Sequence, residues 1–379
     1  MQIAAGNAPR ALGRPLAEME RGCAPAVTRA LTEAVGQDAL RYLAQEDVAR
    51  LQGAVAEWLR ERYGWEPDAE SIRPVSDLVA GFRAVLTHLI PDGQPIIVPT
   101  PGYMPFLSVP QQIGHPVIEV PMLRSAAGWR YDLPGLRAAF EAGARLIVLC
   151  NPHNPIGKVA TEEELAAIEE LVAEFDGIVF ADEIHAPLVL GAGEHIVYAA
   201  RSERAAAHTI TATSASKAFN IPGAKCGQLI FTNPRQLVEW QRVGHWHEHQ
   251  TAVLGVVATT AAYTAGREWL RDTVVGLGET VDAAIALLRD TAEETGIRVI
   301  APDATYLLWL DLTGTELLRE GRTAAEAVRE AAQIVVTDGS SCGAVGVGSV
   351  RFNAALAHAD TMEAVQRLVD AATAAKRAA

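Results

Sequence analysis

Lys217 lies in a sequence context that favours covalent chemistry. It belongs to the segment Ser214-Ala-Ser-Lys-Ala-Phe-Asn-Ile-Pro-Gly223, which directly follows the β-branched run Thr209-Ile-Thr-Ala-Thr213. A lysine after a strand is usually a solvated surface charge. Here, however, two hydroxyls and the backbone N–H groups of the turn can hold a phosphate, while the amine faces the crevice beside it. The segment therefore predicts a phosphate site next to an available amine.

Asp182 and His185 follow a second β-branched run, Gly177-Ile-Val-Phe-Ala181. An acid and a histidine in such a place are more often helix caps or surface groups than catalysts. A carboxylate at a strand end is nevertheless what a pyridinium nitrogen needs, because it keeps the ring nitrogen protonated and lets the ring accept electrons. Asp182 fits that role.

Asn154 lies in a third segment of this kind. The run Arg145-Leu-Ile-Val-Leu-Cys150 leads into Asn151-Pro-His-Asn-Pro-Ile-Gly157, in which two prolines bracket Asn154. One interpretation is a proline-stiffened turn and nothing more, since Asn-Pro and Gly are common turn residues. The other is a rigid turn that holds the Asn154 side chain in place as a hydrogen-bond donor, for example to the phenolic oxygen of a cofactor.

A common scaffold must position these three segments. Short β-branched runs alternate with longer helical patterns, one of which begins with a capping box at Thr161 and Glu164. This alternation predicts an α/β fold with parallel strands joined by crossover helices. Ligands of open parallel sheets sit at the carboxyl ends of the strands. One edge of the sheet is therefore expected to gather Asn154, Asp182 and Lys217.

The pattern changes towards the C-terminus. A helix over 77–90 and a strand over 95–98 precede the alternating region, whereas a helix, short strands at 305–312 and 348–353 and a closing alanine-rich helix follow residue 275. In a chain of 379 residues, this predicts two domains. The large cofactor-binding domain is expected over 45–275, and the small domain over 1–44 and 276–379.

Composition limits the partners and the location. A net charge of −14 argues against a nucleic-acid partner, which would need a positive face. No apolar stretch is long enough to span a bilayer, and residues 1–12 lack the apolar run of a signal peptide, so no membrane association and a cytoplasmic location are expected. The four scattered cysteines form no metal-type or redox-type pair.

Taken together, the motifs resemble those of one superfamily. Asn151-Pro-His-Asn-Pro-Ile-Gly157, Asp182-Glu-Ile-His185 and Ser214-Ala-Ser-Lys-Ala-Phe-Asn220 resemble, in this order, the fold-type I pyridoxal 5'-phosphate (PLP) enzymes of the class I/II aminotransferase superfamily. Within it, the chain is most similar to the branch of cystathionine β-lyases and cysteine-conjugate C–S lyases. Further matches lie at 17–19, 25–27, 62–65, 100–103, 305–311 and 350–353. The resemblance implies a mainly parallel seven-stranded sheet between helices, plus a smaller α+β domain.

The resemblance also implies catalytic and ring-binding roles. Lys217 would carry PLP as a Schiff base and then move the α-proton of the substrate. Asp182 would pair with the pyridine nitrogen, and Asn154 would hydrogen-bond the phenolic oxygen with His185 beside it. Tyr103 would stack on the face of the ring.

Other residues would bind the substrate and the phosphate. Arg351 would clamp the substrate α-carboxylate with a fork of donors that lysine lacks. The phosphate would lie against Ser214, Ser216, Lys225, Asp77, Leu78 and Val79. Tyr42 would reach the phosphate of a neighbouring subunit, which implies a homodimer with shared active sites; a plain helix-packing aromatic is an equally good interpretation of this tyrosine.

Three positions depart from the family pattern. Lys225 stands where aminotransferases commonly have arginine, so it would neutralise the phosphate as a point charge. Asp77 stands where the lyase branch usually has glycine. Because a carboxylate facing a phosphate would repel it, Asp77 is expected to cap the following helix while backbone N–H groups bind the phosphate. Arg41 precedes Tyr42 in place of a frequent glycine.

The segment His245-Trp-His-Glu-His249 formally matches the spacing of an inverted zincin motif, with His245, Glu248 and His249 on one helix face. Such a short match arises easily by chance. The sequence also indicates no further metal ligand that would join His245 and His249. No metal is therefore expected, and a segment of the substrate pocket or of an interface is favoured.

The expected reaction is a β-elimination that converts an S-substituted cysteine into a thiol, pyruvate and ammonia. Two alternatives use the same scaffold: transamination, and decarboxylative oxidative deamination of an S-cysteine conjugate in bacterial secondary metabolism. A non-catalytic regulator that kept the fold is a further alternative. The complete set of Lys217, Asp182, Asn154 and Arg351 argues against a loss of catalysis.

Overall fold

Seven short strands form the central sheet. The computed structural model describes residues 11–37, 39–126 and 128–379. Neighbouring strands are parallel from β8 to β3, whereas β9 is antiparallel to both of its neighbours, so the predicted mainly parallel seven-stranded sheet is confirmed. The order across the sheet is β1 (Ile72–Val75), β9 (Gly227–Phe231), β8 (Thr209–Thr213), β7 (Ile178–Asp182), β6 (Leu146–Cys150), β2 (Ile96–Thr100) and β3 (Val117–Pro121).

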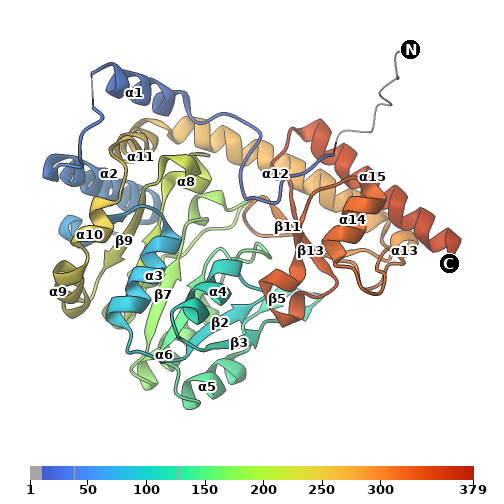
Figure 1. The fold of residues 1–379 in the computed structure, drawn as a ribbon, viewed down its shortest axis with the longest axis horizontal. Helices are drawn as coiled ribbons and strands as arrows, with labels where there is room; N and C mark the ends of the chain where they lie inside the picture. Colours follow the sequence, from blue (N-terminus) through green and yellow to red (C-terminus); the bar gives the residue numbers. More distant parts are fainter. Residues whose placement is uncertain (1–10, 38, 127) are drawn as a thin grey trace, which may run out of the picture.

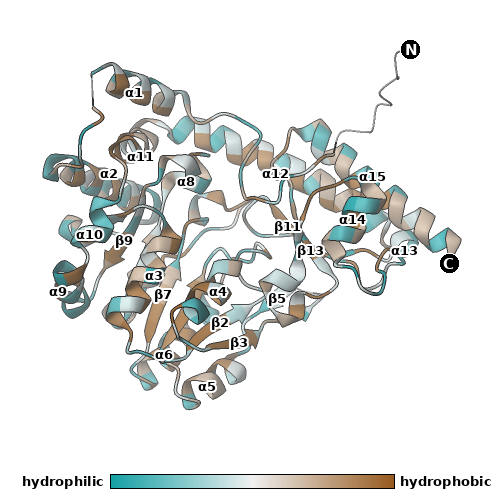
Figure 2. Ribbon diagram, in the orientation of Figure 1, coloured by the Kyte–Doolittle hydropathy of each residue, from teal (hydrophilic) through white to brown (hydrophobic). Residues whose placement is uncertain are grey.

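Two layers of helices bury this sheet (Figure 1). Successive residues of a strand point to opposite faces, so in β6 Leu146 and Val148 pack on one side, and Ile147 and Leu149 on the other. The first side is covered by α3 (Leu78–Leu89), α4 (Met104–Gln112) and α9 (Pro234–Val243). The second side is covered by α5 (Leu133–Glu141), α6 (Glu162–Glu174) and α7 (Glu203–Ala207). Figure 2 shows largely hydrophobic strands inside helices whose outer faces are largely hydrophilic.

A further group of helices packs beside β1 and β9, near the short helix α8 (Ala215–Ala218). Trp58 stacks on Tyr263 in this group, with ring centroids 4.9 Å apart. The contact joins helices that lie about 200 residues apart in the chain into one apolar cluster. The group consists of α1 (Pro25–Gly36), α2 (Gln45–Tyr63) and α11 (Val253–Ala265), whereas the short helix α10 (His245–His249) contacts β1, α3 and α9.

A second, antiparallel sheet forms the core of the C-terminal part. Its strands lie in the order β10 (Arg298–Val299), β11 (Leu307–Asp311), β13 (Ser349–Asn353) and β12 (Thr337–Asp338). The helices around it are α12 (Arg267–Asp290), α13 (Ala292–Thr295), α14 (Ala324–Ala332) and α15 (His358–Ala378), and the strands β4 (Leu123–Ser125) and β5 (Gly128–Arg130) form a separate hairpin. Among the described helices, none combines the length and the hydropathy needed to cross a lipid bilayer.

The helix α12 and the N-terminal segment both run between the apolar cluster around α1 and α2 and the core of the second sheet. The long helix α12 buries Leu270 and Leu277 in the cluster around α1 and α2, and Val281 and Leu288 in the core of the second sheet. The N-terminal segment begins at the core of the second sheet, where Leu12 pairs with Ile334. It then continues to the apolar cluster in which α1 packs on α11. The predicted boundaries near residues 44 and 275 remain predictions, and residues 1–10 of the predicted small domain lie outside the described residues.

Candidate active site

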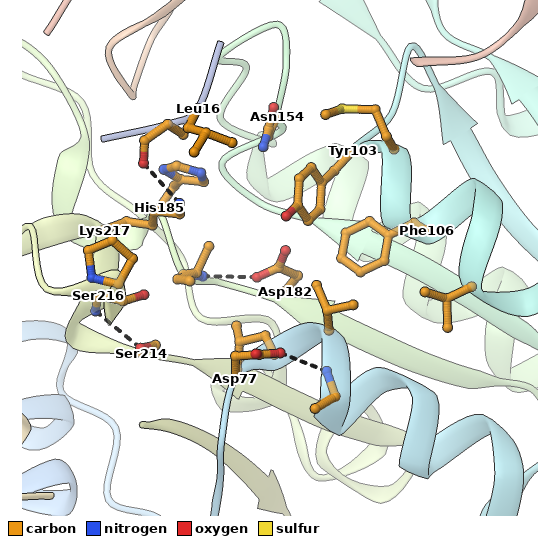
Figure 3. Close-up of a pocket in the computed structure, with 18 of the residues that line it drawn as sticks. Leu16, Asp77, Tyr103, Phe106, Asn154, Asp182, His185, Ser214, Ser216 and Lys217 are labelled. Atoms are coloured by element: carbon orange, nitrogen blue, oxygen red, sulfur yellow. Dashed lines mark hydrogen bonds between the residues drawn. The ribbon is translucent and has the colours of Figure 1, made fainter. Parts of the chain in front are cut away.

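The carboxyl ends of β6, β7 and β8 meet at one cavity of about 600 Å³ (Figure 3). Asn154, Asp182 and Lys217 line it, as expected for polar residues that follow neighbouring parallel strands. Twelve of the thirteen predicted site residues line this cavity, and Tyr42 does not. The twelve are Asp77, Leu78, Val79, Tyr103, Asn154, Asp182, His185, Ser214, Ser216, Lys217, Lys225 and Arg351.

Lys217 is held on the single turn of α8. Ser214 caps this turn, because its Oγ accepts a hydrogen bond from the backbone N–H of Ser216 at 3.1 Å. The Nζ of Lys217 donates to the carbonyl oxygen of Ala17 at 2.9 Å. Burial and then the positive charge of Arg351 lower the pKa of the Lys217 ammonium. The amine is therefore easier to deprotonate than an ordinary lysine, as a nucleophile or base requires.

Asp182 ends β7 and lies at the base of the cavity with 4% of its surface exposed. Its Oδ1 accepts from the backbone N–H of Ile184 at 3.2 Å, and the Sγ of Cys150 lies 3.7 Å from its Oδ2. Burial raises the pKa of the carboxyl to about 6. A buried carboxylate of this kind is stabilised by any cation placed against it, such as a protonated ring nitrogen.

Arg351 and Asn154 form one hydrogen-bonded unit although they lie 197 residues apart. The Nη1 of Arg351 donates to the Oδ1 of Asn154 at 3.0 Å, and the Nη2 donates to the carbonyl of Pro15 at 2.9 Å and to the Oγ1 of Thr337 at 3.2 Å. Arg351 is only 3% exposed, and burial lowers its pKa. These three acceptors hold the guanidinium at the cavity wall, where a carboxylate would find a fixed cation.

His185 and Tyr103 complete the walls around Asp182. Burial and then the charges of Lys217 and Arg351 lower the pKa of His185 to about 3, so its imidazole is neutral. The Nδ1 of His185 is buried and has no hydrogen-bond partner among the described residues. Tyr103 lies at the N-terminus of α4 and directs its ring towards the cavity (Figure 3). Burial, followed by the charge of Asp182, raises the pKa of the Tyr103 phenol.

The corner formed by the start of α3 is rich in donors. Asp77 caps α3, as expected from the sequence, because its Oδ1 accepts from the N–H of Ala80 at 2.8 Å. Its Oδ2 accepts from the Nζ of Lys225 at 2.9 Å. Ser214 lies at the same wall and donates its hydroxyl to the carbonyl of Cys226 at 2.8 Å.

Sequence reasoning missed several residues of the cavity. Leu16, Ala17 and Glu18 of the N-terminal segment line it, although the sequence gives residues 17–19 only a family match and no role. Cys150 does not line the cavity but lies behind it against Asp182, whereas the sequence indicates for it only the absence of a metal-type or redox-type pair. Its place directly before the Asn-Pro turn was the signal that could have identified it.

Tyr42 lies outside the cavity of its own chain. It is 83% exposed and stacks on His249, with ring centroids 5.3 Å apart. In the same region Glu248 is fully engaged, since its carboxylate accepts from Arg73 at 2.8 and 2.7 Å and from the Nε1 of Trp240 at 2.7 Å. No cluster of three or more potential metal ligands exists in the part of the chain that the structure describes.

The residues of the cavity fit PLP. Asp182 offers a buried carboxylate for the ring nitrogen, and Lys217 offers an amine of lowered pKa for the aldehyde carbon. Tyr103 offers an aromatic face, and the buried His185 Nδ1 is an unsatisfied polar atom beside them. The start of α3 and Lys225 supply the N–H groups and the cation that a phosphate requires.

Comparison with known proteins decides the family. Residues 11–368 match the family described as "Aminotransferase class I and II". The chain belongs to this family. The family is PLP-dependent, which confirms the predicted superfamily, fold class and cofactor.

Three relatives illustrate the similarity. A cystathionine β-lyase of Corynebacterium glutamicum is 33% identical over 353 residues, which cover 93% of this chain and 91% of the relative. A protein of Corynebacterium diphtheriae, proposed to be a PLP-dependent β-cystathionase, has a crystal structure that superposes with a TM-score of 0.88 at 34% identity, over 98% and 96% of the two chains. The PLP-bound C–S lyase of Staphylococcus hominis gives a TM-score of 0.87 at 25% identity, over 98% and 96%.

A first prediction for this class I/II enzyme concerns Arg351. Arg351→Lys is expected to raise KM for an amino-acid substrate by about 10- to 100-fold, because a charge-assisted pair of hydrogen bonds becomes a single point contact. Steady-state kinetics should show a smaller change in kcat. Arg201→Lys is the matched control, since Arg201 is a largely buried arginine that pairs with Glu162 and Glu169 away from the cavity. An unchanged KM in Arg351→Lys would contradict the role.

Proposed function

We propose that this protein is a PLP-dependent C–S β-lyase, which converts an S-substituted cysteine and water into a thiol, pyruvate and ammonia. The observation that carries the proposal is the convergence of Lys217, Asp182 and Arg351 on one cavity from three distant parts of the chain. The relative at 33% identity over 93% of the chain, which is named as a cystathionine β-lyase, supports C–S cleavage over the other reactions of this fold.

The proposed mechanism assigns one task to each residue. PLP, when bound, supplies an electron sink for the negative charge that develops at the α-carbon of an amino acid. Asp182 would keep the ring nitrogen of bound PLP protonated, and Asn154 would hydrogen-bond its phenolic oxygen. Arg351 binds the substrate carboxylate and thereby orients the α-hydrogen towards Lys217. Lys217 removes the α-proton, and its ammonium can return a proton to the departing thiolate sulfur.

The defining experiment is a stoichiometric assay with an S-alkylcysteine and with cystathionine. A β-lyase should release pyruvate, ammonia and thiol in equal amounts with no keto acid added. Carbon dioxide should not appear, because the carboxylate stays on the product. Strict dependence on an added keto acid would show transamination instead, and release of carbon dioxide would show decarboxylative deamination.

We also propose that the chain forms a homodimer in which Tyr42 of each subunit approaches the phosphate of the other. Supporting this, Tyr42 lies on an exposed surface with other apolar residues, namely Leu40 at 66% and Trp246 at 70% exposure. Such large exposed apolar groups are typical of contact surfaces. A cytoplasmic location and a place in bacterial secondary metabolism remain predictions from the sequence.

A further inference from the structure

Two departures from the family pattern contact each other. Asp77 and Lys225 lie 148 residues apart in the chain, yet the Nζ of Lys225 donates to the Oδ2 of Asp77 at 2.9 Å. The other carboxylate oxygen of Asp77 accepts from the N–H of Ala80 in the first turn of α3. The carboxylate of Asp77 therefore binds both the N-terminus of the twelve-residue helix α3 and the ammonium of Lys225.

The same two groups line the cavity near the start of α3. If PLP placed its ring nitrogen against Asp182 and its aldehyde carbon at Lys217, its phosphate would lie at another wall. The start of α3 offers backbone N–H groups and a positive dipole end, and Lys225 offers a cation beside it. Arg351, a cation elsewhere in the cavity, is assigned to the substrate carboxylate.

The carboxylate is ionised and half-buried. Although burial opposes it, the N–H of Ala80 and the ammonium of Lys225 hold the pKa of Asp77 below its ordinary value of 3.8. At neutral pH the negative carboxylate of Asp77 therefore already binds the ammonium of Lys225 and the N–H group at the start of α3. A phosphate dianion would need these same donors. Two like charges in one partly buried site repel each other strongly.

We infer that Asp77 competes with the cofactor phosphate for Lys225 and for the N-terminus of α3. The ion pair must open or shift whenever PLP binds, so the chain holds PLP less tightly than the same site would without the carboxylate. Occupancy by the cofactor then depends on its free concentration. This inference rests on the proposed function, since it takes the cavity as the PLP site.

The test is the dissociation constant of PLP from the purified apoprotein, measured by absorbance and by quenching of protein fluorescence. Asp77→Asn should bind PLP about tenfold more tightly than the unmodified chain, because asparagine still caps the helix but carries no charge. Asp77→Ser, which also caps a helix, should act in the same direction. Inorganic phosphate should raise the melting temperature of the Asp77→Asn apoprotein more than that of the unmodified apoprotein.

Two controls separate a phosphate effect from a general one. Pyridoxal lacks the phosphate, so its affinity should be the same in Asp77→Asn and in the unmodified chain. Asp68→Asn removes the same unit of charge away from the cavity, which Asp68 does not line. Like Asp77, Asp68 caps a helix, since it accepts a hydrogen bond from the N–H of Glu70 at 3.0 Å. This substitution should leave PLP affinity unchanged.

The outcomes distinguish this inference from the proposed function. Suppose that the unmodified protein binds PLP, and that Asp77→Asn and Asp77→Ser bind it equally or less tightly. Then the inference that Asp77 competes with the phosphate is wrong, whereas the lyase proposal stands. An equal gain in affinity for PLP and pyridoxal would also overturn the competition, because the effect would not act on the phosphate. A protein that binds no PLP would overturn both.

Discussion

Lys217→Ala is expected to lower the turnover of an S-substituted cysteine by at least about 10⁴-fold, because the variant loses both the covalent attachment of the cofactor and the base that removes the α-proton. The amine is suited to both tasks. It lines the cavity next to Asp182, and burial lowers its pKa towards the range in which it can lose a proton. Pyruvate and thiol release give the rate, and the visible absorption band of protein-bound cofactor gives a second readout.

Lys217→Arg is the matched variant for this prediction. Arginine keeps the positive charge and much of the packing, but it neither forms a Schiff base nor loses a proton at neutral pH. It should therefore be as inactive as the alanine variant and also lack the band. Lys376→Ala, at an exposed lysine that donates to the carbonyl of Glu293, should behave like the unmodified enzyme. Pyruvate release by Lys217→Ala within tenfold of the unmodified rate would contradict the role of Lys217.

Asp182→Asn is expected to lower kcat by about 10³-fold while leaving the fold intact. Asparagine has the shape of aspartate but no negative charge, so it cannot keep a ring nitrogen protonated, and the negative charge at the α-carbon loses its electron sink. Asp182→Glu retains the charge and should recover part of the activity. A rate for Asp182→Asn close to that of the unmodified enzyme would show that the carboxylate is not needed.

The same substitution has a second expected effect, on the stability of the apoprotein. The pKa of Asp182 rises from 3.8 to about 6 on folding, so the neutral carboxyl is favoured in the folded state. Stability is lost as pH rises through that interval, and at pH 8 the buried charge costs on the order of 3 kcal/mol. Asp182→Asn apoprotein should therefore melt at a higher temperature than the unmodified apoprotein at pH 8, and the difference should shrink below pH 4. A lower melting temperature at pH 8 would contradict this account.

Much of the fold follows from local patterns. The run expected at 209–213 is β8 itself, those expected at 145–150 and 177–181 are β6 and β7 to within one residue at each end, and the helix expected at 77–90 is α3. Each of these strands is buried on both faces and therefore forms a continuous apolar or β-branched run. The antiparallel strand β9 was not anticipated, because nothing in Gly227–Phe231 itself reveals which neighbours it joins or in which direction.

The sequence also indicated which chemical groups form the site. A lysine, an aspartate and an asparagine after three successive strands must meet at one edge of a parallel sheet, since the carboxyl ends of such strands coincide. The structure brings Lys217, Asp182 and Asn154 to one cavity. The side-chain types at these positions, together with the motifs around them, were enough to indicate PLP and the family.

Only the tertiary structure decided how these groups are tuned and what they contact. The carbonyl of Ala17 reaches Lys217 across 200 positions of the chain, and Asp77 pairs with Lys225 across 148. The pKa values of Asp182 and His185 are displaced chiefly by burial, which depends on helices and strands packed from the whole chain. The sequence by itself determined which chemical groups stand at the ends of the strands, because that depends on neighbours in the chain. Their charge states and partners depend on distances between remote segments, which exist only once the chain has folded.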